Sequence, residues 1–360
     1  MRILYLTPTS IFSGGERVTL GIAQGMRQRG HEVVYCGLEG PVRAFVEEAG
    51  VPFFALPAFT PAAVKKAVRA YRPDLIHTMD YRASLYASFT GVPFIAHLHN
   101  NPPWLSGLGP NVWAMLLFGH RAGHIFTVSD SVMNEYRFGN LFRPKTTVLG
   151  NTVDASAILG GAACPGGVPE AYRGLAPDLL FFGRLTEQKD PLRFLELVAA
   201  VKRQVPGVTA AMLGEGEMRP ETEAKISELG LGASVTMTGF LKNPYPIVRN
   251  AKLLVMPSKW EGFGLTCVES LTLGLPCLVS PVGGLQELVT PDCGKVCATD
   301  AEFVGEAVRL LTDETYRAER SAAAKQRAEC YTDITAMLDT IESVCRRVPE
   351  PGTDQDRRNG

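Results

Sequence analysis

Short apolar runs alternate with longer amphipathic segments along the first part of the chain. Short runs are typical of buried parallel strands, whereas apolar residues three and four apart are typical of covering helices. The runs predict strands at 3–6, 31–36, 52–56, 75–77, 93–97 and 124–128. Helices are predicted at about 13–29, 61–71, 81–90, 112–122 and 130–136. This repeated order predicts a doubly wound parallel sheet.

The pattern breaks near residue 150 and then restarts. A glycine-rich stretch, 160–169, predicts a connection of low order, and strands follow at 179–182, 208–213, 234–238, 253–256 and 277–280. We therefore predict an α/β protein with one Rossmann-like domain over 1–152, a linker over 153–176 and a second Rossmann-like domain over 177–331. Two such domains would face a central cleft at the carboxyl ends of their strands.

Composition and charge narrow the class of protein. With 360 residues, 46% of them hydrophobic and 20% charged, the chain suits two soluble globular domains. A net charge of −1 gives no indication that the chain binds a nucleic acid. The start of the chain reads as a strand that ends at Pro8, and no apolar run approaches the roughly 18 residues of a membrane span. A disordered tail is predicted over 348–360, where Asp354 and Asp356 match a metal motif by chance.

The eight cysteines are scattered. Cys293 and Cys297 are the closest pair, but no histidine or second pair accompanies them to complete a zinc site, so both are expected in the core or a loop. No metal site is expected. A reduced, cytoplasmic compartment fits this cysteine usage.

The stretch 257–269 carries the strongest chemical signal. An apolar strand leads into a glycine loop, and a helix begins at about Leu265. Backbone N–H groups from Gly262 through Phe263 and Gly264 to Leu265 can point at a phosphate or a sugar hydroxyl. Glu261 and Glu269 bracket this loop and can reach different parts of one ligand. The simpler alternative is that both are solvated helix-end acids.

Two further loops have the residues of anion sites. Arg184 and Lys189 follow the first strand of the second domain and can converge on one pyrophosphate, although each alone could belong to a solvated basic loop. Gly14 and Gly15 follow the first strand of the chain and open a helix, as in a phosphate loop or a plain tight turn. Their spacing differs from the dinucleotide motif, which disfavours a nicotinamide-dependent dehydrogenase.

Strand ends supply the remaining candidates. His97 and His99 alternate along one strand and so share a face, and either could reach the cleft, whereas His77 is expected to be mainly structural. Gly214 ends one strand of the second domain, and Gly239 with Phe240 ends the next. These glycines lie on the expected ligand-facing edge, although either could be a plain turn.

Several of these strings resemble one known family. Residues 261–269 resemble the Glu-x7-Glu motif of the family 4 retaining glycosyltransferases, and residues 183–189 resemble its Gly-Arg-Leu donor loop with a following lysine. Residues 13–18 resemble its Gly-Gly-x-Glu-Arg-Val loop, with Ser13 in place of the first glycine. Ser129, 151–154 (with Thr152 for the usual glycine) and 283–287 resemble further segments. The resemblance extends from Ser13 to about Val289 and implies the GT-B fold.

The resemblance also implies roles for the candidate residues. Glu261, His99, Arg184 and Lys189 would be catalytic, with His99 matching the family's cleft histidine better than His97. The diphosphate would be bound by Gly14, Gly15, Arg184, Lys189, Gly264 and Leu265, and the donor sugar by His99, Glu261, Gly262, Phe263 and Gly264. Glu269 would bind the ribose, and Gly214, Gly239 and Phe240 would lie at the base. A last helix, about 332–346, would cross back to the first domain.

The expected activity is transfer of a hexose or N-acetylhexosamine from a nucleoside-diphosphate sugar, a UDP-sugar being favoured, to an acceptor hydroxyl. The family's front-face mechanism implies neither a metal nor another cofactor. A sugar-nucleotide epimerase or hydrolase of the same fold, or a non-catalytic sugar-nucleotide-binding subunit, remains an alternative. The acceptor is left open among a sugar, a small molecule and a lipid-linked glycan. A peripheral membrane contact through 101–118 is weighed against plain packing of that segment in the first domain.

Overall fold

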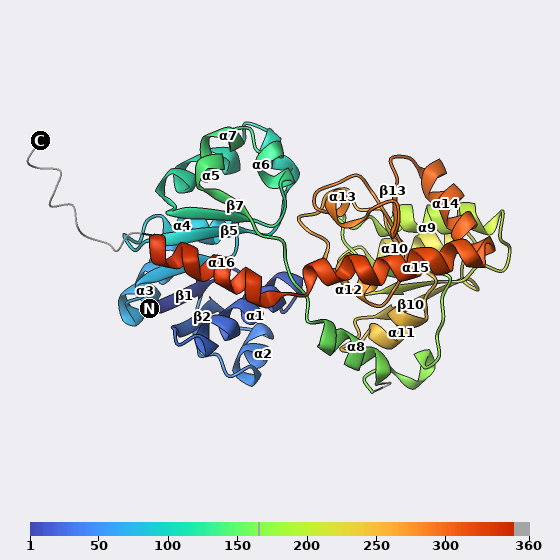
Figure 1. The fold of residues 1–360 in the computed structure, drawn as a ribbon, viewed down its shortest axis with the longest axis horizontal. Helices are drawn as coiled ribbons and strands as arrows, with labels where there is room; N and C mark the ends of the chain where they lie inside the picture. The colour runs from blue at the N-terminus through green and yellow to red at the C-terminus, as the bar shows by residue number, and fades with distance from the viewer. Residues whose placement is uncertain (165, 349–360) are drawn as a thin grey trace, which may run out of the picture. The chain divides into compact units, whose positions relative to one another are not determined.

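The computed structural model describes residues 1–164 and 166–348. They form two compact units (Figure 1). The first comprises Met1–Thr152 and the last helix, and the second comprises Val153–Asp333. Most of the predicted tail, with Asp354 and Asp356, lies outside the described residues.

A parallel sheet with the strand order β3-β2-β1-β4-β5-β6-β7 forms the centre of the first unit. Its apolar strands are buried on both faces, as the continuous hydrophobic runs predict. The strands are β1 (Arg2–Leu6), β2 (Glu32–Leu38), β3 (Phe53–Leu56), β4 (Leu75–Thr78), β5 (Phe94–Leu98), β6 (His124–Thr127) and β7 (Thr146–Val148).

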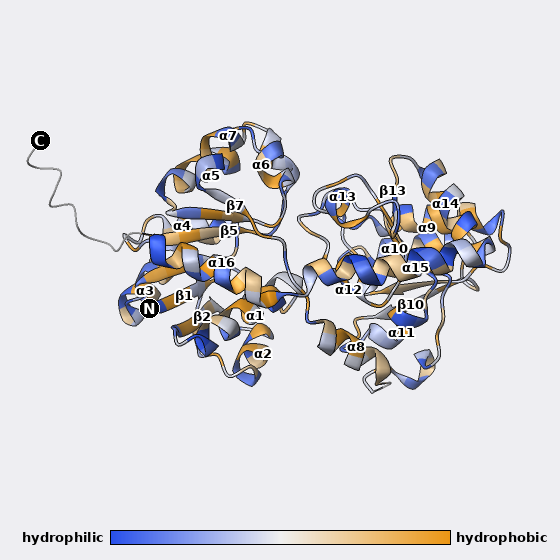
Figure 2. Cartoon of the chain, in the orientation of Figure 1, coloured by the Kyte–Doolittle hydropathy of each residue, from blue (hydrophilic) through white to orange (hydrophobic). Residues whose placement is uncertain are grey.

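Helices cover this sheet and turn their apolar faces inward. Figure 2 shows hydrophobic residues gathered on the strands and hydrophilic residues on outer helix faces. The helices are α1 (Gly14–Gln28), α2 (Val42–Glu48), α3 (Pro61–Tyr71), α4 (Tyr81–Ala87), α5 (Pro110–Arg121), α6 (Ser131–Glu135), α7 (Gly139–Phe142) and α16 (Ile334–Arg347). Throughout residues 1–164 and 166–348, no helix combines the length and the apolar character needed to cross a membrane.

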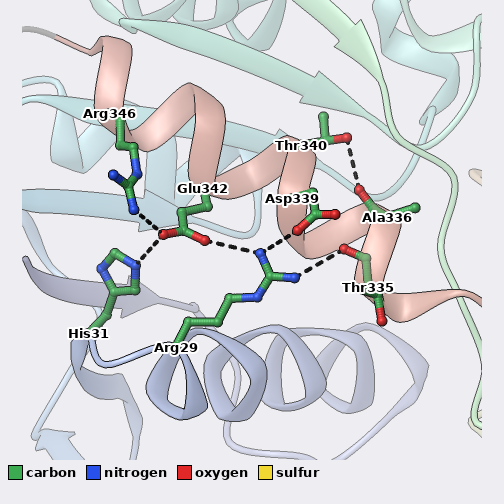
Figure 3. A network of polar contacts seen from close by, with 8 residues as sticks. All are labelled: Arg29, His31, Thr335, Ala336, Asp339, Thr340, Glu342 and Arg346. Atoms are coloured by element: carbon green, nitrogen blue, oxygen red, sulfur yellow. Dashed lines mark hydrogen bonds and ion pairs between the residues drawn. The ribbon is translucent and has the colours of Figure 1, made fainter.

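A polar network holds α16 against the first unit (Figure 3). The Glu342 carboxylate accepts hydrogen bonds from Arg29 at 3.0 Å and from Arg346 at 2.6 Å, and it lies 3.3 Å from Nε2 of His31. Arg29 also pairs with Asp339 at 2.7 Å. The Arg346 and Arg29 guanidiniums lower the pKa of Glu342 to about 2.

Close packing between α1 and α16 accompanies this network. A Cβ built on Gly25 of α1 would lie only 2.3 Å from Cδ1 of Leu338, which is buried. The absence of a side chain at Gly25 therefore lets α16 approach α1 and bury its apolar stripe.

A second parallel sheet, in the order β10-β9-β8-β11-β12-β13, forms the centre of the second unit. Its strands are β8 (Leu179–Phe182), β9 (Ala210–Leu213), β10 (Val235–Gly239), β11 (Leu253–Met256), β12 (Cys277–Val279) and β13 (Gly294–Val296). Its helices are α8 (Ala155–Ala163), α9 (Pro191–Lys202), α10 (Arg219–Glu228), α11 (Tyr245–Asn250), α12 (Leu265–Thr272), α13 (Leu285–Leu288), α14 (Asp300–Thr312) and α15 (Glu314–Ala328).

The stretch predicted as a linker, 153–176, is part of the second unit and contains α8. A Cβ on Gly161 of α8 would lie 2.8 Å from the ring of Tyr245, so the glycine permits α8 to pack closely on α11. The Asn243 amide donates to the carbonyl of Gly161 at 2.9 Å, near the end of α8. Gly161 therefore serves packing, which the compositional argument for a connection of low order could not distinguish.

Several elements have no counterpart among the predicted ones. They include α2, β7 and β13, of which the two strands are only three residues long. Strand β13 begins at Gly294, where a Cβ would lie 2.0 Å from the carbonyl oxygen of Cys277 on β12. Pairing with β12 rather than local periodicity therefore defines this strand. Cys293 and Cys297 are free and buried, as predicted.

Candidate functional site

The strand order of the second sheet reverses between β8 and β11. From this point β8, β9 and β10 follow one another in one direction, and β11, β12 and β13 follow in the other. The loops after β8 and β11 diverge where the order reverses, which is where open parallel sheets bind ligands. Residues 183–190 and 257–264 form these two loops.

An ion pair joins the two loops. The ammonium of Lys189 contacts the Glu261 carboxylate, and their side chains are only 12% and 11% exposed. Gln188 connects the two loops beside this pair. Its side-chain amide donates to the backbone carbonyl of Trp260 at 3.1 Å, and its backbone carbonyl accepts from the N–H of Lys259 at 2.9 Å. Largely buried charges require such partners, so neither can be removed without exposing the other to an unfavourable environment.

Arg184 lies exposed on the same loop as Lys189. Its guanidinium contacts Oε1 of Gln188 at 3.4 Å. Gly183 packs along the stem of Lys189, since a Cβ there would lie 3.5 Å from Cε. The two cations that were predicted to converge thus share a loop but have different protein partners.

Glycines also shape the neighbouring loop, which follows β9. A Cβ on Gly214 would lie 1.9 Å from the carbonyl oxygen of Gly183, and one on Gly216 would lie 2.2 Å from that of Leu185. The backbones of the two loops therefore touch directly. Any side chain at Gly214 or Gly216 would push the loop with Arg184 and Lys189 out of place.

Gly264 sets the direction of the loop at the start of α12. Its φ is +106°, a conformation that residues with a side chain rarely adopt. A Cβ there would lie 2.5 Å from Cδ2 of Leu285, so α13 packs directly against the loop. The first N–H groups of α12, beginning at Leu265, have no acceptor within the helix and lie at the positive end of its dipole. This is a ready site for an anion.

The other loop residues are held by neighbouring elements. The N–H of Gly284 donates to the carbonyl of Gly262 at 3.1 Å, and Phe263 packs edge-on against Tyr331, with ring centroids 5.7 Å apart. Glu269, predicted for the ribose, is 6% exposed on α12. The hydroxyl of Tyr245 donates to Oε1 of Glu269 at 3.3 Å and fixes the direction of that carboxylate.

The residues predicted near the base lie together at the end of β10. The N–H of Gly214 donates to the carbonyl of Gly239 at 3.0 Å, so the ends of β9 and β10 are directly bonded. Gly239 has a φ of +72°, and the next residue, Phe240, is 72% exposed. No core packing accounts for an aromatic ring at that exposure, and its open face is suited to stacking.

In the first unit, Gly14 and Gly15 form the first turn of α1. A Cβ on Gly15 would meet no atom within 4 Å, so the space beside it is open. The N–H and hydroxyl of Ser13 both donate to the carboxylate of Glu16, which closes the helix start as a capping box. An acidic side chain therefore already lies where a phosphate was predicted.

Three histidines stack at the carboxyl ends of β4 and β5. The ring centroids of His77 and His97 are 5.4 Å apart, and those of His97 and His99 are 4.1 Å apart. His77 and His97 are fully buried, and His99, which follows the end of β5, is partly exposed as a residue but has both ring nitrogens buried. Burial lowers the pKa of His99 to about 4, with contact from Asn151 acting in the opposite direction.

Sequence reasoning missed the residues that support the site. Gln188 and Tyr245 hold charged residues in place, yet neither stands out by composition or spacing. The hydroxyls of Thr186 and Ser258 are buried in the two loops and have no hydrogen-bond partner among the described residues. Buried hydroxyls of this kind are usually satisfied by water or ligand. Among residues 1–164 and 166–348, no three His, Cys, Asp or Glu side chains are grouped as metal ligands.

Comparison with known proteins gives the family. Residues 12–157 match the family model described as Glycosyltransferase Family 4, and residues 173–327 match the one described as Glycosyl transferases group 1. A glycogen synthase of Mycobacterium tuberculosis is 28% identical over 277 residues, which cover 72% of this chain and 65% of that protein. The matched stretch thus spans just under two thirds of this relative's length.

A second relative and a solved structure extend the comparison. A GDP-mannose-dependent alpha-(1-6)-phosphatidylinositol dimannoside mannosyltransferase of M. tuberculosis is 30% identical over 157 residues, or 43% of this chain and 40% of that protein. The structure of Anabaena HepE in complex with UDP-glucose superposes with a TM-score of 0.84 at 20% identity, covering 96% of this chain and all of that one (100%). Its fold, two Rossmann-like units, is the GT-B fold. The chain belongs to the family 4 glycosyltransferases.

Proposed function

We propose that this chain is a retaining glycosyltransferase that moves a hexose or N-acetylhexosamine from a nucleoside-diphosphate sugar to an acceptor hydroxyl. The Lys189–Glu261 pair carries the proposal, because it lies where the second sheet reverses its order, beside the N-terminus of α12. The cation and helix amides suit a diphosphate, and the carboxylate suits sugar hydroxyls. A UDP-sugar is favoured because HepE, which matches nearly the whole chain, was crystallised with UDP-glucose, whereas the GDP-mannose-dependent relative matches under half.

Each residue of the second unit then has a role that its surroundings support. The exposed Arg184 can turn from Gln188 to the diphosphate, and Lys189 can share its charge between Glu261 and that group. Glu269, oriented by Tyr245, accepts hydrogen bonds from the ribose, and Phe240 stacks on the base. The backbone of Gly262, Phe263, Gly264 and Leu265 binds the sugar and the phosphates.

The reaction balances without a protein nucleophile. The bond between the anomeric carbon and the diphosphate oxygen breaks, and its electron pair leaves with the diphosphate. The acceptor oxygen forms the new bond on the same face of the sugar and gives its proton to the departing diphosphate. Arg184 and Lys189 stabilise the growing negative charge, and no metal is included in this step. As the family resemblance implies, Gly14, Gly15 and His99 are proposed to act on the same donor.

The test is donor hydrolysis by the purified full-length chain with EDTA and no acceptor. The donors are UDP-glucose, UDP-galactose, UDP-N-acetylglucosamine, UDP-N-acetylgalactosamine and GDP-mannose, and the readout is release of nucleoside diphosphate. Slow release from one donor, lost in Arg184→Ala and Glu261→Gln, supports the proposal. Lys259→Met is the matched control, because Lys259 pairs with Glu187 at 3.4 Å and is 47% exposed.

Other outcomes point to other functions. A released sugar whose configuration has changed at a ring carbon other than the anomeric carbon indicates an epimerase. Turnover only after a divalent metal is restored contradicts the metal-independent step. No turnover, together with no thermal shift from UDP or GDP, indicates a non-catalytic subunit.

We also propose that this protein is cytoplasmic and makes a peripheral contact with the inner face of the membrane. Support comes from an exposed apolar patch, with Leu108 59%, Trp113 51% and Leu141 58% exposed. Trp113 of α5 packs beside Phe138, which precedes α7, so α5 and α7 share this surface. The exposed cations Arg137 and Arg143 lie on the adjoining segment. Trp113→Ala should reduce co-sedimentation with phosphatidylglycerol vesicles, whereas Phe89→Ala, which removes an exposed ring elsewhere, should not.

A further inference from the structure

The family models leave out the stretch 158–172, since they match residues 12–157 and 173–327. This stretch includes most of α8, a helix that packs against both α11 and α12. In Figure 1, α8 and α11 lie side by side in the second unit. Helix α12 carries Glu269, which is proposed to bind the ribose. Helix α8 therefore lies beside the helix that is proposed to bind the nucleotide.

Gly161 of α8 is the point of contact with Tyr245, the first residue of α11. A Cβ on Gly161 would lie 2.8 Å from Cδ2 of the Tyr245 ring and 3.1 Å from Oδ1 of Asn243. A Cβ on Gly160, the preceding residue of the same helix, would meet no atom within 4 Å. The missing side chain at Gly161 therefore leaves the space that the tyrosine ring occupies beside α8.

Asn243 fastens α8 to the start of α11. Its side-chain amide donates to the backbone carbonyls of Gly161 at 2.9 Å, Cys164 at 3.1 Å and Gly166 at 3.2 Å. Its Oδ1 accepts from the N–H of Tyr245 at 3.4 Å. One side chain therefore holds both the backbone of Tyr245 and the glycine that makes room for the Tyr245 ring.

The tyrosine ring that is held in this way reaches the carboxylate that is proposed to bind the ribose. The hydroxyl of Tyr245 donates to Oε1 of Glu269 at 3.3 Å, and Glu269 is 6% exposed. An ionised acceptor strengthens such a hydrogen bond. A glutamate that is free to rotate loses rotamer freedom when it binds a ligand, so a carboxylate that Tyr245 has already fixed binds at a lower entropic cost.

We infer that Tyr245 is a positioning residue for nucleotide recognition. Held by Gly161 and Asn243, it fixes the Glu269 carboxylate so that the enzyme distinguishes a ribonucleotide from a nucleotide that lacks the ribose hydroxyls. The inference rests on the proposed function for the role of Glu269. An ionised carboxylate has about four acceptor sites, so Oε1 can accept from Tyr245 and from a ribose hydroxyl at once. The base takes no part, so the effect should be the same for UDP and GDP.

Isothermal titration calorimetry of the full-length chain tests this inference. The ligands are UDP and GDP, each with its 2′,3′-dideoxy counterpart. The wild type should bind the ribonucleotide at least about tenfold more tightly than the dideoxy counterpart. In Tyr245→Phe, the affinity for the ribonucleotide should fall about tenfold while that for the dideoxy counterpart stays within about twofold. Equal loss of both affinities would show a structural role and overturn the inference, and so would an unchanged preference.

Matched variants separate the position of Tyr245 from its chemistry. Tyr316→Phe removes a bond of the same kind in the same unit, because the Tyr316 hydroxyl donates to Oε1 of Glu306 at 2.7 Å, and it should leave the preference unchanged. Gly161→Ala should displace the Tyr245 ring and reduce the preference, whereas Gly160→Ala, which has open space beside it, should not. A reduced preference in either control, or a full preference in Gly161→Ala, would overturn the inference.

Failure of this inference and failure of the proposed function give different results. If the chain is not a transferase, donor hydrolysis is absent while the preference for the ribonucleotide and its dependence on Tyr245 remain. If Tyr245 has no positioning role, donor hydrolysis proceeds and the preference does not depend on Tyr245. A chain that binds neither UDP nor GDP overturns both proposals.

Discussion

Gly264→Ala tests whether the loop before α12 is built as the structure indicates. The substitution adds one methyl group where φ is +106° and where Cδ2 of Leu285 would lie 2.5 Å away. Gly230→Ala is the matched control in the same unit. Gly230 also has positive φ, +62°, but a Cβ there would meet nothing within 4 Å. The pair separates the cost of the backbone conformation from the cost of the contact.

The two costs have different sizes. A side chain in the left-handed helical region costs about 1–2 kcal/mol, which is the whole expected effect at Gly230. At Gly264 the backbone lies farther from that region, and a cost of about 1–3 kcal/mol is expected. Overpacking against Leu285 adds about 1–3 kcal/mol. We therefore expect Gly264→Ala to destabilise the second unit by about 2–6 kcal/mol, and Leu285→Val to relieve the packing part, since valine has no Cδ.

Urea unfolding followed by Trp260 fluorescence measures this effect. In a Trp104→Phe, Trp113→Phe background, Trp260 is the remaining tryptophan and reports the second unit. Donor hydrolysis should also fall at least tenfold, because displacement of the loop moves Glu261 and the first amides of α12. The reasoning is refuted if Gly264→Ala destabilises no more than Gly230→Ala and leaves hydrolysis unchanged.

Three further predictions follow from the same structure. Lys189→Met should lower donor turnover by about 10²–10³-fold, as loss of a transition-state charge partner does, whereas Lys259→Met should change it less than twofold in the same assay. The pKa of Glu342 is lowered from 4.5 to about 2, so the Glu342 carboxylate stabilises the packing of α16 fully above pH 4.5 and loses this effect as the pH falls through about 2. The free energy of unfolding, measured against pH, should show this loss in the wild type and not in Glu342→Gln. The pKa of His99 is lowered to about 4, so this side chain is neutral from pH 5 to 8. The pH profile of donor hydrolysis should therefore show no ionisation near pH 6.5. An ionisation near 6.5 that disappears in His99→Gln would contradict the burial of His99.

Much of the architecture could be predicted from the periodicity of apolar residues. The strands Leu179–Phe182 and Leu253–Met256 have the predicted bounds, because fully buried parallel strands are continuous apolar runs. The last helix, predicted at about 332–346, is found at Ile334–Arg347. The short β13 could not be predicted, since Gly294 and its neighbours form a strand only by pairing with β12. Similarly, Gly161 resembled a flexible residue although it is required for helix packing.

In the candidate site, the charged residues could be predicted from the sequence, whereas the residues that hold them in place could not. Glu261 and Lys189 could be proposed from residue type and loop position, but that they contact each other depends on two strands that are distant in sequence and adjacent in the sheet. Gln188 and Tyr245 act through hydrogen bonds whose geometry no local pattern encodes. The reversal in strand order, which depends on the complete topology, is what links these residues to one place.

Both sheets have this reversal, but the two units carry different side chains at it. In the second unit the loops after β8 and β11 bring Lys189, Arg184 and a helix N-terminus to the edge of the sheet, which suits a ligand with several negative charges. In the first unit the equivalent edge has a cavity of about 500 Å³ that is lined by Trp104 and Tyr81, with amides, one carboxylate and a single cation, Arg82. Placing a second arginine in this cavity, as Asn111→Arg, should therefore add a site for inorganic pyrophosphate that isothermal titration calorimetry detects, and a binding stoichiometry unchanged from the wild type would show that side-chain charge does not determine the difference.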